Sequence, residues 1–298
     1  MDQQKHKAGF VNILGKPNVG KSTLMNALMG ERLSIITSKA QTTRHRIMGI
    51  LNGDDYQIVY SDTPGILNPA YELHKAMMRF VDSALEDADV MLFMTDVYEQ
   101  FSEEDKYLNE IIKRINDSTT TVIFLLNKID QKSEQEVDLK LEQWKGIVKA
   151  TKYLPISALH AANLKELFET IIENLPEHPA YFPKDEMTDK SERFFAAEIL
   201  REKIFLNYKK EVPYSSEVVI AEFKESEDII RIRAEIYVER RTQRSILIGK
   251  NGEALKKVGT EARLDMEAFF GKKVFLEQYV RVEEDWRKSS TKLNRFGY

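Results

Sequence analysis

Residues Gly15–Ser22 read GKPNVGKS and match the pattern GxxxxGK followed by Ser or Thr. An apolar run at 10–14 precedes them, and apolar residues at helical spacing follow over 22–29. This order predicts a strand, a loop and a helix, the setting in which the pattern binds phosphate. Gly15 and Gly20 let the backbone turn so that its N–H groups meet one anion. A plain glycine-rich turn is the alternative, but the full pattern with these flanks is rare by chance, so we predict a phosphate site.

Two side chains at the end of this loop suit nucleotide phosphates. The ammonium of Lys21 can reach β- and γ-phosphate oxygens, and the Ser22 hydroxyl can coordinate Mg²⁺. Further along, residues 62–65 read DTPG and have the pattern DxxG. A carboxylate at Asp62 can hold Mg²⁺ through water, and Gly65 can bring its N–H group against a γ-phosphate. The two motifs together predict a nucleoside triphosphate as the ligand.

Around these motifs the sequence alternates between strand-like and helical segments. Such alternation predicts a mostly parallel sheet with helices on both faces, and therefore an α/β fold. Residues 31–45 form a long connector beside the phosphate loop, which is a common place for functional residues. Besides 10–14 and 22–29, the expected strands are 46–51, 56–61, 90–95, 121–126 and 153–156, and the expected helices are 73–85, 102–115 and 163–173.

The motif at 127–130, NKID, indicates which base is bound. Guanine presents N1–H and its 2-amino group side by side, and the two oxygens of Asp130 can accept both. Adenine has an acceptor at N1, and a buried mismatch of this kind discriminates by about 10⁴-fold. Asn127 would join this loop to the phosphate loop, Lys128 would cover the base, and a backbone N–H at Ser157-Ala158 would reach the guanine carbonyl. The predicted GTP-binding residues are Asn18, Gly20, Lys21, Ser22, Thr23, Asp62, Thr63, Pro64, Gly65, Asn127, Lys128, Asp130, Ser157 and Ala158.

These elements resemble, in order, those of a translation-factor-related small GTPase. The resemblance implies a Ras-like P-loop fold, Mg²⁺ dependence and a switch between GTP and GDP. It also implies Thr43 as a Mg²⁺ ligand together with Ser22 and Asp62, with Thr42 as the alternative. Ras-like enzymes carry glutamine directly after DxxG, but this chain has Ile66, which cannot orient water. We therefore expect slow intrinsic hydrolysis.

Asn18 is relevant to the missing glutamine after DxxG. Related GTPases with a hydrophobic residue after DxxG often use a phosphate-loop asparagine to hold K⁺, and Asn18 occupies the matching position. The alternative is that Asn18 only shapes the turn. The predicted cofactors are thus GTP or GDP, Mg²⁺ and, on the first of these interpretations, K⁺, and the predicted catalytic residues are Lys21, Thr43, Gly65 and Asn18.

Composition limits the remaining classes. The length of 298 residues suggests about two domains. The chain has no cysteine, which excludes disulfides and thiolate metal sites, and its five histidines lack ligand spacing. No apolar run approaches the roughly 18 residues that span a bilayer, and the N-terminus does not look like a signal peptide. We expect a cytoplasmic monomer.

A second domain is expected after residues 175–183, which contain three prolines. The predicted division is a GTPase domain at 1–178, a linker at 179–190 and an RNA-binding domain at 191–298. Asp189 and Glu192 have the spacing of a capping box for the first helix. Strands at 217–223 and 229–238, helices at 243–248 and 253–270, and a strand at 274–282 follow. The basic tail, 286–298, would either contact phosphate or fray.

The loop at 249–252 reads GKNG and joins the last two helices. It lies in a basic segment, since Arg240 to Lys257 hold six Lys or Arg against one acid, Glu253. The order α-β-β-α-α-β with this loop resembles a type II KH domain, in which glycines let a nucleic-acid backbone approach and an apolar groove receives unstacked bases. A solvated turn between helices is the alternative. The predicted RNA-binding residues are Arg244, Ile246, Ile248, Gly249, Lys250, Asn251, Gly252, Lys256 and Lys257.

The combination of both domains resembles the bacterial Era family over essentially the whole chain. The most specific matches are TTRHR at 42–46, DTPG at 62–65 and IGKNG at 248–252. The resemblance implies a GTP-hydrolysing switch that binds the 3′ end region of 16S ribosomal RNA and assists maturation of the small ribosomal subunit, with peripheral contact at the inner face of the cell membrane. The alternative is a signalling GTPase that acts on a protein or membrane partner in cell-cycle control.

Overall fold

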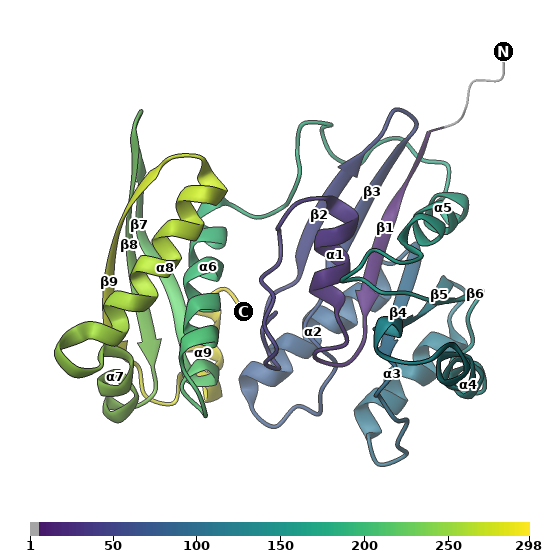
Figure 1. Ribbon diagram of the computed structural model, residues 1–298, viewed down its shortest axis with the longest axis horizontal. Coiled ribbons are helices and arrows are strands. Elements are labelled where there is room, and N and C mark those ends of the chain that lie inside the picture. The colour runs from purple at the N-terminus through teal and green to yellow at the C-terminus, as the bar shows by residue number, and fades with distance from the viewer. Residues whose placement is uncertain (1–5) are drawn as a thin grey trace. The chain divides into compact units, whose positions relative to one another are not determined.

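The computed structural model describes residues 6–298. They form two compact units, one made of the chain up to Ala70 with His74–Asp189, the other of Tyr71–Leu73 with Lys190–Tyr298 (Figure 1). The exact limits of domains and linker stay a prediction. Part of the expected linker is bound to the first unit, because the side chain of Gln57 donates to Phe182 O at 2.8 Å.

The first unit is built on a six-stranded sheet in the order β2-β3-β1-β4-β5-β6. Only β2 and β3 pair antiparallel, so the predicted mostly parallel α/β fold is confirmed. Every residue of β4 is buried, as expected for a central strand covered on both faces. The strands are β1 Lys7–Leu14, β2 Ile47–Asn52, β3 Tyr56–Asp62, β4 Val90–Asp96, β5 Thr121–Asn127 and β6 Lys152–Pro155; the helices are α1 Lys21–Met29, α2 Glu72–Glu86, α3 Lys106–Asp117, α4 Glu134–Lys145 and α5 Leu164–Asn174.

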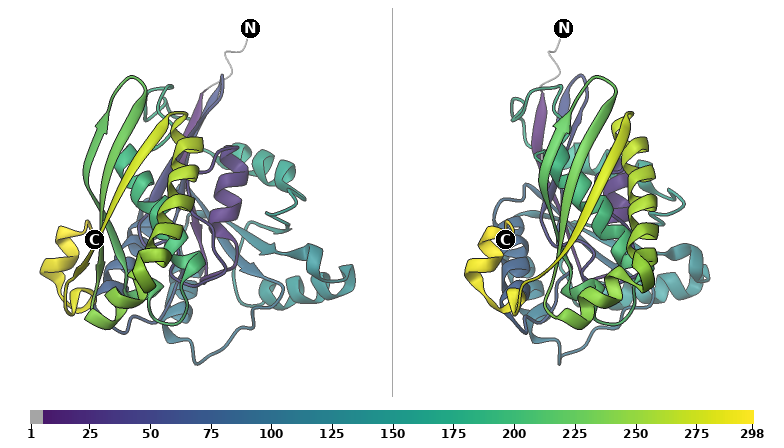
Figure 2. Two further views of the ribbon diagram at one scale, coloured as in Figure 1. Left: turned by 60° about the vertical axis from the view of Figure 1, so that its left-hand side comes forward. Right: turned by 90° about the vertical axis from the view of Figure 1, so that its left-hand side faces the viewer.

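The second unit packs helices against a three-stranded sheet in the order β7-β8-β9 (Figure 2). Strand β8 pairs antiparallel with β7 and parallel with β9, and the helices α7 and α8 supply the crossover that a parallel pair requires. The predicted order α-β-β-α-α-β is therefore confirmed. The strands are β7 Glu217–Glu225, β8 Ile229–Val238 and β9 Lys273–Val282; the helices are α6 Glu192–Asn207, α7 Arg241–Ile248, α8 Glu253–Phe270 and α9 Ser290–Arg295; short 3₁₀ turns are η1 Ile129–Gln131, η2 Pro213–Ser215, η3 Lys250–Gly252 and η4 Trp286–Lys288.

The structure corrects one expectation about local structure and decides against one alternative for the tail. Asp189 does not cap α6, because its Oδ1 accepts from Met48 N at 3.0 Å and the capping position belongs to Ser191. The basic tail does not fray. Trp286 is fully buried and donates its indole N–H to Ser215 O at 3.0 Å, and Leu293 of α9 is 2% exposed.

Among residues 6–298, no helix has the length and apolar character needed to cross a bilayer.

Candidate functional site

The phosphate loop joins β1 to α1 and is tied to the loop after β5. Asn127 Nδ2 donates to Val19 O at 2.7 Å, while Ala158 N donates to Asn127 Oδ1 at 2.9 Å. Gly20 has φ 105°, and a Cβ there would lie 2.3 Å from Asn127 Nδ2. The loop conformation thus requires glycine at this position, and a single amide holds two motifs together.

Lys21 is buried at the start of α1. Its ammonium donates to Gly15 O at 3.0 Å and to Lys16 O at 2.8 Å. Burial lowers the pKa of Lys21 to about 8, although the nearby Asp62 carboxylate acts in the opposite direction. The cation is therefore held by loop carbonyls at a cost in solvation, which phosphate oxygens would relieve.

Three side-chain oxygens meet where a Mg²⁺ ion is expected. Ser22 Oγ lies 2.6 Å from Asp62 Oδ2 and 2.9 Å from Thr43 Oγ1, and Thr43 Oγ1 lies 3.3 Å from Asp62 Oδ2. The second oxygen of Asp62 is buried and has no hydrogen-bond partner among residues 6–298. Burial raises the pKa of Asp62, against the hydrogen bond from Ser22. Two hydroxyls and a carboxylate, one oxygen of which has no partner among residues 6–298, are hard oxygen ligands that fit Mg²⁺.

The structure distinguishes the two candidate threonines by position. Thr42 Oγ1 lies 2.5 Å from Thr37 Oγ1 and donates to Lys39 O at 2.7 Å. These hydrogen bonds of Thr42 therefore stay within the connector. Thr43 instead lies beside Ser22 and Asp62.

The DxxG segment lies against the phosphate loop. A Cβ on Gly65 would approach Pro17 N within 2.6 Å, and Ile66 N donates to Gly15 O at 3.0 Å. Thr63 Oγ1 donates to Ile13 O at 2.7 Å. The side chain of Ile66 is buried and has no polar atom for a water molecule.

At the expected base end, Ser157 orients the carboxylate of Asp130. Ser157 Oγ donates to Asp130 Oδ1 at 2.5 Å, and this hydrogen bond is the main reason that the pKa of Asp130 is lowered. Lys128 spans two elements, because its Nζ donates to Asn18 O at 2.8 Å and to Asp96 Oδ2 at 2.6 Å. An ionised, oriented carboxylate is what two guanine donors require.

A cavity of about 320 Å³ collects most of the predicted nucleotide residues. Asp62, Pro64 and Ala158 are buried and do not line it. Several wall residues were not predicted, including Leu159, which is 71% exposed and directly follows Ser157-Ala158. The predicted residues in the wall are Asn18, Gly20, Lys21, Ser22, Thr23, Thr43, Thr63, Gly65, Asn127, Lys128, Asp130 and Ser157, and the missed ones include Pro17, Ile35, Ile36, Gln131 and Leu159.

The second predicted site is the loop between α7 and α8. Gly249, Asn251 and Gly252 have φ values of 72°, 52° and 78°, so the backbone turns sharply through left-handed conformations. Lys250 and Asn251 are exposed, and a Cβ at Gly252 would have no neighbour within 4 Å. Of the other predicted RNA contacts, Arg244, Ile246, Lys256 and Lys257 are exposed and Ile248 is half-buried.

The four cations of the basic tail are in ion pairs. Arg287 pairs with Glu239, and Lys288 pairs with Asp285. Lys292 and Arg295 both pair with Glu283.

Comparison with known proteins identifies relatives of both units. Residues 10–128 match the family described as 50S ribosome-binding GTPase, and residues 211–287 match the KH domain. The chain is 46% identical over 294 residues to GTPase Era of Syntrophus aciditrophicus (strain SB), covering 98% of this chain and 95% of that protein.

Two solved structures are similar over nearly the full length. Era in complex with MgGDPNP and nucleotides 1506–1542 of 16S ribosomal RNA has a TM-score of 0.93 and 41% identity, covering 98% of this chain and 99% of that one. A variant of Aquifex aeolicus Era bound to GDP and AlF₄⁻ has a TM-score of 0.92 with the same identity, 41%, and the same coverage, 98% and 99%. The chain described here belongs to the Era family of GTPases.

Proposed function

We propose that this protein is a GTP-dependent switch that binds the 3′ end region of 16S ribosomal RNA and assists assembly and maturation of the small ribosomal subunit. The observation that carries the proposal is the presence, in one chain, of a guanine-type nucleotide cavity and an exposed GxxG loop. A relative with 41% identity over nearly its whole length has been crystallised with MgGDPNP and nucleotides 1506–1542 of 16S ribosomal RNA.

In the GTP-bound state, Lys21 exchanges its two loop carbonyls for phosphate oxygens. Ser22 and Thr43 offer hydroxyls, and Asp62 its carboxylate, as the Mg²⁺ ligands. When bound, Mg²⁺ neutralises charge on the β- and γ-phosphate oxygens. Gly65 brings backbone close to the γ-phosphate, while Asn127, Lys128, Asp130, Ser157 and Ala158 hold the base.

Asn18 serves in this proposal as a K⁺ ligand that compensates for Ile66. Asn18 has φ 65°, and its Nδ2 donates to Ser38 O at 3.2 Å, so a role in shaping the turn is the competing explanation. Asn18→Gly separates the two, because glycine accepts the same φ but has no amide oxygen. We expect faster hydrolysis in KCl than in NaCl for the wild type and no difference for Asn18→Gly. Equal wild-type rates in the two salts would contradict K⁺ stimulation.

The GxxG loop supplies the RNA contact. Gly252→Asp places an anion where phosphate would approach, and Gly271→Asp is a matched control. Gly271 also has a positive φ, 66°, and open space around it, but it lies at the opposite end of α8. The two variants therefore share backbone strain and differ in their distance from the loop.

The experiment is fluorescence anisotropy with single-stranded oligonucleotides from the 16S 3′ end, with GDP and with a non-hydrolysable GTP analogue. We expect tight, sequence-selective binding that Gly252→Asp abolishes and Gly271→Asp retains. An RNA affinity that differs between GDP and the GTP analogue would support the switch. Equal RNA affinities would contradict it. Weak binding that is indifferent to Gly252→Asp would instead favour a signalling GTPase with a protein or membrane partner.

The monomeric state, the cytoplasmic location and a peripheral contact with the inner face of the cell membrane remain part of the proposal. The membrane contact rests on the family resemblance, and the cytoplasmic location on the lack of a spanning apolar run and of a signal-peptide pattern in the sequence. Light scattering after size exclusion tests the first, and co-sedimentation with vesicles of phosphatidylglycerol and phosphatidylethanolamine tests the last. No co-sedimentation at low salt would remove the membrane contact.

A further inference from the structure

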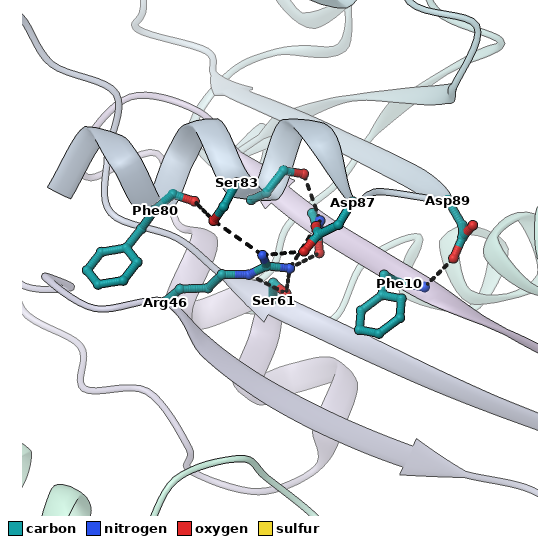
Figure 3. A network of polar contacts seen from close by, with 9 residues as sticks. Phe10, Arg46, Ser61, Phe80, Ser83, Asp87 and Asp89 are labelled. Carbon is teal, nitrogen blue, oxygen red and sulfur yellow. Dashed lines mark hydrogen bonds and ion pairs between the residues drawn. The ribbon is translucent and has the colours of Figure 1, made fainter. Parts of the chain in front are cut away.

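A buried arginine joins the connector to the end of α2 (Figure 3). Arg46 lies directly before β2, three residues after Thr43, and is 7% exposed. Its Nη1 and Nη2 lie 2.6 and 2.9 Å from Oδ2 and Oδ1 of Asp87, the residue that follows α2. Two parallel hydrogen bonds between a guanidinium and a carboxylate fix orientation as well as distance.

The same guanidinium reaches two strands of the sheet. Nε and Nη2 donate to Ser61 Oγ at 3.1 and 2.9 Å, and Nη2 also donates to Asn12 Oδ1 at 3.2 Å. Asn12 and Ser61 are fully buried and face each other in the register of β1 and β3. Asn12 Nδ2 donates in turn to Asp87 Oδ1 at 2.6 Å, so the carboxylate is held from two sides.

This network lies next to two expected Mg²⁺ ligands along the chain. Ser61 directly precedes Asp62, and Arg46 closes the connector that carries Thr43. Ile47, the neighbour of Arg46, is the cross-strand partner of Asp62. The two segments that present Thr43 and Asp62 are therefore joined through one guanidinium.

Through Asp87, the network also includes helix α2, which follows the DxxG segment. Helix α2 has no basic residue in its last turn, so Arg46 supplies the cation that the carbonyl end of a helix favours. Arg46 Nη1 also lies 3.4 Å from Ser83 Oγ, one turn before the end of the helix. The arginine thereby couples the exit of the connector to the far end of α2.

We propose that Arg46 and Asp87 are positioning residues that set Thr43 and the DxxG segment for a γ-phosphate. The proposal rests on the role of Thr43 under Proposed function. GDP is held by the phosphate loop and by the loop around Asp130. The hydrogen bonds of Arg46 to Asn12, Ser61, Ser83 and Asp87 reach neither of these loops. Loosening the clamp should therefore weaken GTP binding more than GDP binding, because a mutation shifts selectivity only through contacts that differ between the two states.

The test compares two neutralised carboxylates at the same helix. Asp87→Asn weakens the clamp, and Asp82→Asn weakens a more exposed arginine–aspartate pair, in which Asp82 Oδ1 lies 2.5 Å from Arg114 Nη1. The two aspartates have comparable side-chain exposure, 45% and 38%. The partner of Asp82, Arg114, belongs to α3, whereas Arg46 directly precedes β2. Asp82→Asn therefore shows the effect of losing an ion pair of α2 that does not involve the connector.

The measurements are the dissociation constants of GDP and of a non-hydrolysable GTP analogue, and the Mg²⁺ concentration that half-saturates analogue binding. For Asp87→Asn we expect the GTP-to-GDP affinity ratio to fall about tenfold and the Mg²⁺ requirement to rise. Asp82→Asn should keep the wild-type ratio. Equal weakening of both nucleotides, or an unchanged ratio in Asp87→Asn, would show that the pair only stabilises the fold.

Two more variants keep the result interpretable. Ser61→Ala removes one acceptor of Arg46 without changing a charge, and it should shift the ratio in the same direction as Asp87→Asn. Thr43→Ala tests the underlying role directly. If Thr43→Ala leaves the ratio unchanged, the proposed Mg²⁺ role of Thr43 is wrong. If Thr43→Ala shifts the GTP-to-GDP affinity ratio while Asp87→Asn and Ser61→Ala do not, only the positioning inference fails.

Discussion

The nucleotide cavity and the GxxG loop both use glycines with positive φ, but their surroundings are opposite. Gly20 is enclosed, with Asn127 where its Cβ would be, and the neighbouring polar atoms bond to one another. Gly252 has open space around it, and the adjacent Lys250 and Asn251 are exposed to solvent. The first arrangement encloses its polar groups around a cavity, whereas the second presents bare backbone and charge to solvent.

The charges differ in the same way. Lys21 and Asp62 are buried, so each carries a desolvation penalty that ligand binding changes. Lys250, Lys256 and Lys257 are exposed, and their contribution is expected to depend on salt through counterion release. Substitutions that affect one site and leave the other intact test this difference.

The largest effect is expected from Asp130→Asn. The amide would place a donor against the N1–H and 2-amino donors of guanine, and we expect GDP affinity to fall by about 10⁴-fold. Titration with a fluorescent GDP analogue measures this, and Asp138→Asn, an exposed carboxylate on α4, is the control. RNA binding by the GxxG loop should stay close to wild type. A loss of less than about tenfold would show that Asp130 does not read the base.

A pair of glycine substitutions should have a smaller effect, on stability. Gly20→Ala combines a left-handed φ with a clash against the Asn127 amide and should lower the free energy of unfolding by about 3 kcal/mol. Gly252→Ala has the φ strain alone and should cost about 1 to 2 kcal/mol. Denaturant unfolding of the nucleotide-free variants measures both. Equal costs would mean that the two loops are not packed as differently as the structure indicates.

The smallest effect is a pH dependence confined to the nucleotide site. The pKa of Lys21 is about 8 in the nucleotide-free protein, and phosphate oxygens would raise it by favouring the ammonium. Binding therefore takes up a proton above pH 8, so GDP affinity is complete below that pH and falls as pH rises, by at most about tenfold per unit. Calorimetry from about pH 7 to 9 in two buffers of different ionisation enthalpy measures the uptake. Constant affinity without proton uptake would contradict the prediction.

Much of the fold was predictable because its signals are local in the chain. Strands such as 90–95 are apolar runs, and the alternation with helices predicted a mostly parallel sheet. Helix α4 was missed even though Ser133 and Glu136 form a capping box that is visible in the sequence. Only Val137 and Trp144 of this helix are buried, so its apolar periodicity is weak.

Asp189 and Arg287 have partners that lie far away in the chain. The spacing of Asp189 suited a cap, but its carboxylate accepts instead from the backbone N–H of Met48 in the sheet. The tail looked like a free basic segment, yet Arg287 pairs with Glu239 and Trp286 donates to Ser215 O. No local pattern carries that information, since sheet register and packing decide which distant groups meet.

The motifs, their order and the chemistry open to each can be read from the sequence. The glycines of the phosphate loop, the lysine and serine that end it, and the carboxylate that ends NKID are all properties of short stretches. The tertiary structure alone decided that Thr43 rather than Thr42 meets Ser22 and Asp62, and that Arg46 bonds to Asp87. These choices depend on the order and register of β1, β2 and β3, which bring together residues that are distant in the chain.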